Sequence, residues 1–166
     1  MNEEYEKKLE SVIKQIFEEL KGKEIYLAGS AALYLQGIRY EKLSHDVDFC
    51  LLSDTETSKN YARYFSHCLK STKLFVDVLV RSHEFHQSRN IEILKIDFRS
   101  LSNIPIASVK DCLNCKYEFM TSDVLNIEKR RKHFSQFKYL LETDQLPSDI
   151  KDKFLKDFKS LEQTLL

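Results

Sequence analysis

The sequence predicts an α/β (α+β) fold in which helices pack on a mixed, mostly antiparallel sheet of about four or five strands. Short segments with alternating apolar residues indicate the strands, and longer segments with apolar residues at helical spacing indicate the helices. The chain has 166 residues, of which 42% are hydrophobic and 31% charged, as in ordinary globular proteins. We therefore expect a single domain over residues 1–166, with a core at 22–106 and a helical C-terminal part at 107–166.

Charge and hydropathy narrow the class of protein. The 26 basic and 26 acidic side chains cancel, which argues against a protein that coats nucleic acid, although a local basic patch is compatible with this balance. The charged N-terminus has no apolar signal-peptide core, and the longest apolar run falls far short of the roughly 20 residues that span a bilayer. We expect a cytoplasmic protein without membrane contact.

The expected helices and strands alternate along the chain. The first helix has apolar residues from Leu9 to Leu20 at helical spacing and ends at Gly22. Pro105 favours an edge position for the last strand, which is preceded by a turn at Ser102-Asn103. Helices are expected at 2–21, 31–36, 53–71, 108–120, 123–141 and 147–166, and strands at 25–28, 46–49, 73–80, 91–98 and 104–106.

Two acidic residues on one of these strands indicate a metal site. Asp46 and Asp48 are two residues apart, so the strand period places both on one face, while Val47 and Phe49 point into the core. Two adjacent carboxylates repel each other unless a cation lies between them. Such oxygen-rich sites suit Mg²⁺ or Mn²⁺.

A Gly-Ser turn just upstream adds a second element. Gly29 and Ser30 follow an apolar strand and enter a helix of small residues, so they offer exposed backbone N–H groups and a hydroxyl for a phosphate. A phosphate-binding turn before a carboxylate pair indicates metal-dependent phosphoryl or nucleotidyl transfer.

The stretch from Ile25 to Leu52 resembles the signature of the polymerase β-like nucleotidyltransferase superfamily, in which an apolar residue, Gly and Gly or Ser precede a helix and an Asp-apolar-Asp pair. Here the two parts are Ala28-Gly29-Ser30 and Asp46-Val47-Asp48. The Gly-Ser-Ala-Ala-Leu form and the segment Ser44–Phe49 are similar to two bacterial branches. One branch contains abortive-infection (type IV toxin) nucleotidyltransferases, and the other contains minimal enzymes of the antibiotic-adenylyltransferase kind. The resemblance implies a nucleotidyltransferase fold.

The resemblance also implies a third carboxylate on a neighbouring strand. Asp77 matches this element, because its strand comes directly after the helix that follows Asp48. Asp97 is the rival, since toxin-like relatives can have a Lys-apolar-Asp strand in that role, although Lys95 and Asp97 share a face and could pair with each other. The other reading of Asp77 is a residue on a strand edge that faces solvent.

Further residues are candidates for nucleotide binding. Arg39 resembles an Arg that relatives place before the Ser/Thr-x-Asp element, and it either reaches the triphosphate or is a solvated loop residue. Ser44 either caps the local turn or touches the site. Lys116 falls where related minimal enzymes carry a Lys that could meet a nucleotide phosphate, and Lys110 is a weaker candidate.

A basic run lies on the predicted helix at 123–141. It comprises residues 129–132 with Lys138, and it is either a solvated helix face or a positive rim for a triphosphate or an RNA end. Relatives often carry Arg-x-Lys-Asp followed by another Asp. Here the two acidic positions are occupied by His133 and Gln136.

The function implied by this resemblance is transfer of a nucleoside monophosphate from a nucleoside triphosphate (NTP) to an acceptor hydroxyl, with Mg²⁺ or Mn²⁺. Asp46 and Asp48 would bind the metal with Asp77 as a further ligand or as general base, and Gly29 and Ser30 would bind the phosphates. The acceptor is a small molecule, a tRNA or other RNA end, or a protein. The alternative is a catalytically inactive, antitoxin-like nucleotide-binding or interaction module. The last helix closes the domain or pairs with a second copy or partner protein.

Two short motifs receive a structural interpretation. Cys112-x-x-Cys115 lies in a predicted helix without a second Cys pair, so we expect reduced thiols. His83-x-x-His86 has no Cys pair or carboxylate cluster near it in the sequence to complete a zinc site.

Overall fold

The computed structural model describes residues 2–54, 72–122 and 126–166. Apart from residues 53 and 54, the helix predicted at 53–71 lies outside the described residues. None of the described helices combines the length and the apolar character needed to cross a membrane.

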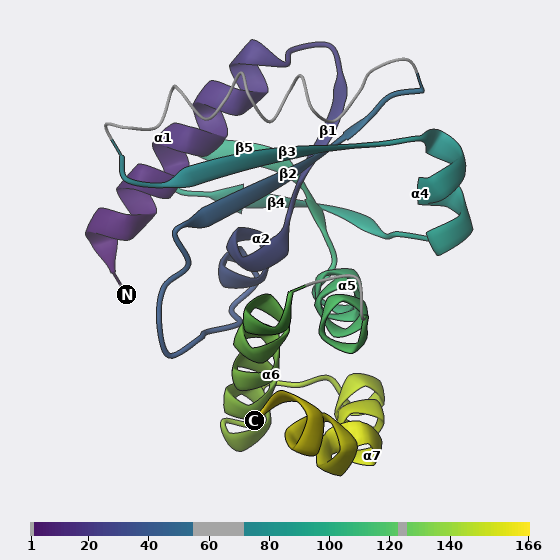
Figure 1. Ribbon diagram of the computed structural model, residues 1–166. Coiled ribbons are helices and arrows are strands. Elements are labelled where there is room, and N and C mark those ends of the chain that lie inside the picture. Colours follow the sequence, from purple (N-terminus) through teal and green to yellow (C-terminus); the bar gives the residue numbers. More distant parts are fainter. Residues whose placement is uncertain (1, 55–71, 123–125) are drawn as a thin grey trace.

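One sheet of five strands, in the order β3-β2-β1-β5-β4, forms the centre of the molecule (Figure 1). The pairs β1–β2 and β4–β5 are antiparallel, whereas β2–β3 and β1–β5 are parallel. The expected strand number is confirmed, but the expectation of a mostly antiparallel sheet is wrong. Period-two alternation does not encode direction, and the connection at 53–74 has the length of a parallel crossover. The strands are β1 (Glu24–Ala28), β2 (Asp46–Leu52), β3 (Phe75–Arg81), β4 (Ile93–Phe98) and β5 (Leu101–Ala107).

Helices cover both faces of this sheet. Helix α1 lies on one face and α2 and α5 lie on the other, with α6 and α7 stacked beyond α5 (Figure 1). Asn2, Ser108 and Asn126 cap the starts of α1, α5 and α6 by accepting a backbone N–H. The helices are α1 (Glu3–Glu19), α2 (Gly29–Leu35), α4 (His83–Arg89), α5 (Val109–Thr121), α6 (Ile127–Glu142) and α7 (Ser148–Leu165).

The core determines which face of β2 is free for chemistry. Val47 and Phe49 are fully buried, and the Phe49 ring meets Phe17 of α1 at 5.9 Å between centroids. Asp46 and Asp48 alternate with these residues, so they lie on the opposite face, toward α2, α5 and α6. The predicted alternation along β2 is therefore confirmed.

Helix α7 packs within its own chain. Phe154 contacts Phe134 and Phe137 of α6 at centroid distances of 5.8 and 5.3 Å. Ile150 and Leu165 of α7 are buried as well. Of the two predicted roles of this helix, closing the domain is the one that these contacts support.

Strand β5 differs from its predicted position. It lies between β1 and β4 rather than at an edge, and its turn is at Arg99-Ser100 instead of Ser102-Asn103. Pro105 is tolerated there because the β1–β5 ladder is short, with Leu27 opposite Ile106 as its aligned pair. The turn signal at Asn103 marks a backbone irregularity within the strand, where Asn103 has φ +57°.

Helix α4 was missed by the sequence analysis because it is short and buries no residue. Ser82 caps its start, and Asn90 ends it in a left-handed conformation. The His83 ring lies between two carboxylates that are distant in sequence, with Nδ1 2.9 Å from Asp54 and Nε2 2.5 Å from Glu24. Hydrogen bonds to these two carboxylates raise the pKa of His83.

We predict a pH-dependent contribution of His83 to stability. Both ring nitrogens donate only in the imidazolium form, and the pKa of His83 is higher in the folded than in the unfolded chain. The contribution is therefore complete below the unfolded pKa of about 6.5 and is lost as the pH rises through the folded pKa. In urea unfolding from pH 6 to 9, the stability difference between wild type and His83→Gln should shrink with rising pH. The control His45→Gln, at an exposed position, should show no such trend.

Candidate functional site

Strand register brings the three predicted carboxylates together. Asp48 of β2 is aligned with Asp77 of the parallel neighbour β3, and Asp46 lies two residues before Asp48 on the same face. Asp77 is exposed, as expected for a residue on the edge strand, and it is nevertheless adjacent to the Asp46–Asp48 pair. Asp77 therefore faces solvent on an edge strand, as one interpretation predicted, and also lies beside the carboxylate pair, as the other predicted.

The Asp48 carboxylate packs directly against the backbone of Gly29. A Cβ atom on Gly29 would lie 2.0 Å from Oδ2 of Asp48, and Gly29 has φ +64°. Glycine is thus required twice, by its backbone conformation and by the close approach. Burial raises the pKa of Asp48 to about 6; the nearby Lys116 opposes this rise, and Asp46 and Asp77 add to it.

A buried ammonium group lies beside this carboxylate. Lys116 of α5 is 8% exposed and donates to the Ser30 hydroxyl of α2 over 3.0 Å. Burial lowers the pKa of Lys116, and the charge of Asp48 counteracts that effect. The predicted proximity of Ser30 and Lys116 to the carboxylates is therefore present. Because α2 has only seven residues, the hydroxyl and the ammonium group, rather than a helix dipole, would provide anion binding here.

A second lysine contacts the carboxylates from α6. Nζ of Lys132 lies 3.3 Å from Oδ2 of Asp46, and both side chains are more than half exposed. Sequence reasoning included Lys132 only as part of the basic run. The signal that separates it from its neighbours is its place in the Arg-x-Lys element on which the family resemblance rests in part.

Most of the basic run is exposed on α6, and its two arginines also contact neighbouring helices. Arg130 donates to the carbonyl of Met120 over 2.9 Å, and Arg131 donates to the carbonyl of Leu165 over 2.5 Å. These contacts connect α6 to the end of α5 and to the end of α7. Within the run, Lys132 contacts a predicted catalytic carboxylate, that of Asp46.

The residues at the replaced acidic positions contact each other. Nδ1 of His133 lies 3.4 Å from the Gln136 side-chain oxygen, and the imidazole stacks on Phe119. Burial, together with the nearby Lys116 charge, lowers the pKa of His133 to about 4. His133 is therefore neutral at physiological pH and adds no positive charge to the site.

Two predicted nucleotide-binding residues, Arg39 and Ser44, have contacts within the chain. Arg39 stacks over the Tyr34 ring at 4.0 Å and donates to the Tyr34 carbonyl, while Gln145 binds both backbone groups of Arg39. Ser44 caps the start of β2, because its hydroxyl accepts the N–H of Asp46 over 3.1 Å. The contacts of Arg39 are thus with Tyr34 and Gln145, and Ser44 acts on Asp46 through the backbone.

The weaker candidates lie elsewhere. Asp97 is on β4, the edge strand on the far side of the sheet from β3, where it accepts the N–H of Asn103 over 2.9 Å. Lys110 pairs with Asp149 of α7 at 3.1 Å. Strand order therefore separates Asp97 from Asp46 and favours Asp77 as the third carboxylate.

The carboxylate oxygens of the site are of the type that binds Mg²⁺, but the described side chains are not arranged around a metal position. Within the described ranges, no group of three or more His, Cys, Asp or Glu side chains is placed to hold a metal ion. Asp46 contacts Lys132, and Asp48 lies against Gly29. Mg²⁺, however, is usually bound by one or two carboxylates with substrate phosphates and water. Asp46 and Asp48, on one face of β2, are two carboxylates that could serve such a site.

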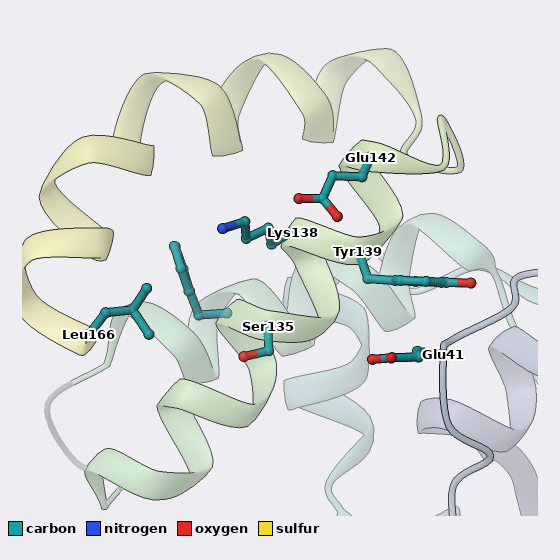
Figure 2. Close-up of a pocket in the computed structure, with 7 residues that line it drawn as sticks. Glu41, Ser135, Lys138, Tyr139, Glu142 and Leu166 are labelled. Atoms are coloured by element: carbon teal, nitrogen blue, oxygen red, sulfur yellow. The ribbon is translucent and has the colours of Figure 1, made fainter.

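A groove of about 450 Å³ runs across α6 away from these residues (Figure 2). Glu41 of the connector and Tyr139 lie on one side of α6, whereas Lys138 projects to the other side (Figure 2). The full lining is Glu41, Phe134, Ser135, Lys138, Tyr139, Glu142 and Leu166. None of the predicted site residues lines it.

The two cysteines of α5 are free thiols as expected, whereas the carboxylates beside His83 were not expected from the sequence. Cys112 is buried and Cys115 exposed on α5, and both are free thiols. His86 packs against the Tyr26 ring. Cys68 lies outside the described residues.

No family model matches the chain, and no curated protein matches its sequence.

We predict that Gly29→Ala destabilises the protein more than Gly37→Ala. Both glycines have positive φ, but a Cβ at Gly37 meets nothing within 4 Å, whereas at Gly29 it collides with Asp48. The Gly37 variant should lose about 1 kcal/mol from backbone strain. The Gly29 variant should lose about 1–3 kcal/mol more from the collision. Urea unfolding measures both, and equal losses would show that Asp48 does not press on Gly29.

We also predict that Asp48→Asn stabilises the metal-free protein at neutral pH. The pKa of Asp48 is about 6 in the folded chain, above its ordinary value of 3.8, so its charge destabilises the fold as the pH rises through this window. The variant should exceed wild type by about 2–3 kcal/mol at pH 8. The gain should vanish near pH 4. Urea unfolding in EDTA tests this, and a gain that is independent of pH would contradict it.

Proposed function

We propose that the chain is a metal-dependent nucleotidyltransferase with a polymerase β-like nucleotidyltransferase fold, which moves a nucleoside monophosphate from an NTP to an acceptor hydroxyl. The observation that carries this proposal is the register of β2 and β3, which aligns Asp48 with Asp77 beside Asp46. Three carboxylates on one open face concentrate negative charge that a divalent cation would neutralise. Burial is the main cause of the raised pKa of Asp48, and the charges of Asp46 and Asp77 add smaller contributions.

The groups around the carboxylates suit a polyphosphate. The Ser30 hydroxyl and the Lys116 ammonium are already in contact, and a phosphate oxygen would take one hydrogen bond from each. Lys132 is exposed and would turn from Asp46 to a phosphate when metal ions neutralise the carboxylate. Positively charged donors beside the transferring phosphate favour the reaction by positioning and charge neutralisation.

Asp46 and Asp48 would hold Mg²⁺ or Mn²⁺, which supplies charge neutralisation and lowers the pKa of an attacking hydroxyl when it is bound. Asp77 has the exposure needed to meet that hydroxyl, either as a further ligand or as general base. Among the described strands, β3 lies at an edge of the sheet. The acceptor would be a small molecule, an RNA end or a protein.

One set of observations favours a second candidate, an inactive nucleotide-binding module. Lys132 contacts Asp46. The acidic residues expected from the resemblance are replaced by His133 and Gln136, which contact each other. The described side chains also form no group of three metal ligands. Such a module would bind an NTP through Ser30 and Lys116 without turnover. It would show no product with any acceptor class.

We predict Mg²⁺-dependent binding of at least one of the four NTPs in calorimetry. Asp46→Asn/Asp48→Asn should weaken this binding by more than about tenfold, because the metal links carboxylate and phosphates. Asp97→Asn is the matched control, since Asp97 lies on the far edge strand, and it should bind as wild type does.

The outcomes separate the two candidates. Release of pyrophosphate with bulk tRNA or with a panel of hydroxyl-bearing small molecules identifies an enzyme. Binding that persists without metal in the double variant, and without turnover, identifies the inactive module. The enzyme proposal is wrong if millimolar NTP does not bind at all.

A further inference from the structure

An exposed phenyl ring lies beside the carboxylates. Phe75, the first residue of β3, is 69% exposed, compared with 37% for Phe85 and 36% for Phe119. A single exposed aromatic residue is common on protein surfaces and needs no explanation by itself. The significance of Phe75 comes from its position.

The strand register places Phe75 on the candidate catalytic face. Phe75 is aligned with Asp46 in the parallel β2–β3 ladder, and it lies two residues before Asp77. Alternate residues share a face, so the phenyl ring stands on the side of the sheet that carries the three carboxylates. Among the described strands, β3 is at the edge, so Phe75 lies at the outer side of that face.

The backbone around Phe75 is firmly held. Its neighbours Leu74 and Val76 are 3% and 6% exposed, which anchors the chain on both sides in the core. Its N–H donates to the His45 carbonyl over 2.7 Å at the start of the ladder. The ring is therefore presented outward from an ordered strand, which reduces the entropy lost when a ligand covers it.

The distance from the phosphate-binding groups to Phe75 suits a nucleotide. Ser30 follows β1, and β1 and β3 are separated by β2. Neighbouring strands are about 4.8 Å apart, so β1 and β3 lie roughly 10 Å apart. A nucleotide with its phosphates at Ser30 and Lys116 would pass over Asp46 and Asp48, and its base would reach the outer edge at Phe75.

We propose that Phe75 is the platform on which the base of the bound nucleotide stacks, an inference that rests on the proposed function. A phenyl face binds any base through its π surface and selects weakly among them. Phe75 would therefore add affinity for a nucleotide over a bare polyphosphate and would tolerate both purines and pyrimidines. The ring acts in binding and takes no part in the chemical step.

The test compares an NTP with inorganic tripolyphosphate, both with Mg²⁺, in calorimetry. Phe75→Ala should weaken NTP binding about 5- to 150-fold, the range of one base–aromatic stack, and should leave tripolyphosphate binding unchanged. Phe75→Leu, which keeps the apolar bulk and loses the aromatic ring, should resemble the Ala variant. Phe75→Tyr should bind as wild type does.

A fluorescent probe gives a second readout. The chain contains no Trp, so Phe75→Trp introduces a single reporter at the proposed platform. NTP should quench its emission, and tripolyphosphate should not. The matched control is Phe85→Trp, on α4 beside Arg81 at the other end of β3, whose emission should not respond to either ligand.

The possible results distinguish this inference from the function on which it rests. Failure of wild type to bind both NTP and tripolyphosphate would overturn the proposed function. Normal wild-type binding with unchanged NTP affinity in Phe75→Ala would overturn the stacking role alone. A dimer in sedimentation that dissociates on Phe75→Ala, with nucleotide affinity intact, would assign the ring to contact between copies and also overturn stacking.

Discussion

A carboxylate with little access to water lies against a turn that only glycine can form, and the candidate site is arranged around this contact. Asp48 approaches Gly29 so closely that any Cβ would collide with it. Desolvation makes the negative charge of Asp48 costly, and Lys116 provides only part of the compensation. The negative charge of Asp48 is thus only partly compensated, and a bound cation would compensate the rest.

The helical C-terminal part takes part in the site as well as in the packing. Helix α5 supplies the buried Lys116, and α6 supplies Lys132 at Asp46. The aromatic packing of Phe154 against α6 joins α7 to the same unit. The carboxylates of the sheet therefore face the lysines of the helices. Such an arrangement suits a substrate with several negative charges that binds together with metal ions.

Local patterns explain which parts could be predicted from the sequence. Period-two alternation places Asp46 and Asp48 together, and apolar residues at helical spacing identify α1, α5, α6 and α7, the first three of which also have a side-chain cap. Helix α4 was not predicted because its seven residues include no buried side chain and so show no apolar pattern at helical spacing. Pro105 was misplaced because a short ladder on one side allows a proline inside a sheet.

The sequence by itself determined the carboxylate pair on one strand and the glycine turn before it, since each depends on neighbours within a few residues. Only the tertiary structure decided which distant groups meet them. The parallel β2–β3 register aligns Asp77 with Asp48 and Phe75 with Asp46, and the strand order carries Asp97 to the far edge. Helix packing brings Lys132 to Asp46 and leaves Arg39 on Tyr34. Strand direction and helix docking depend on the whole core, and no local pattern encodes them.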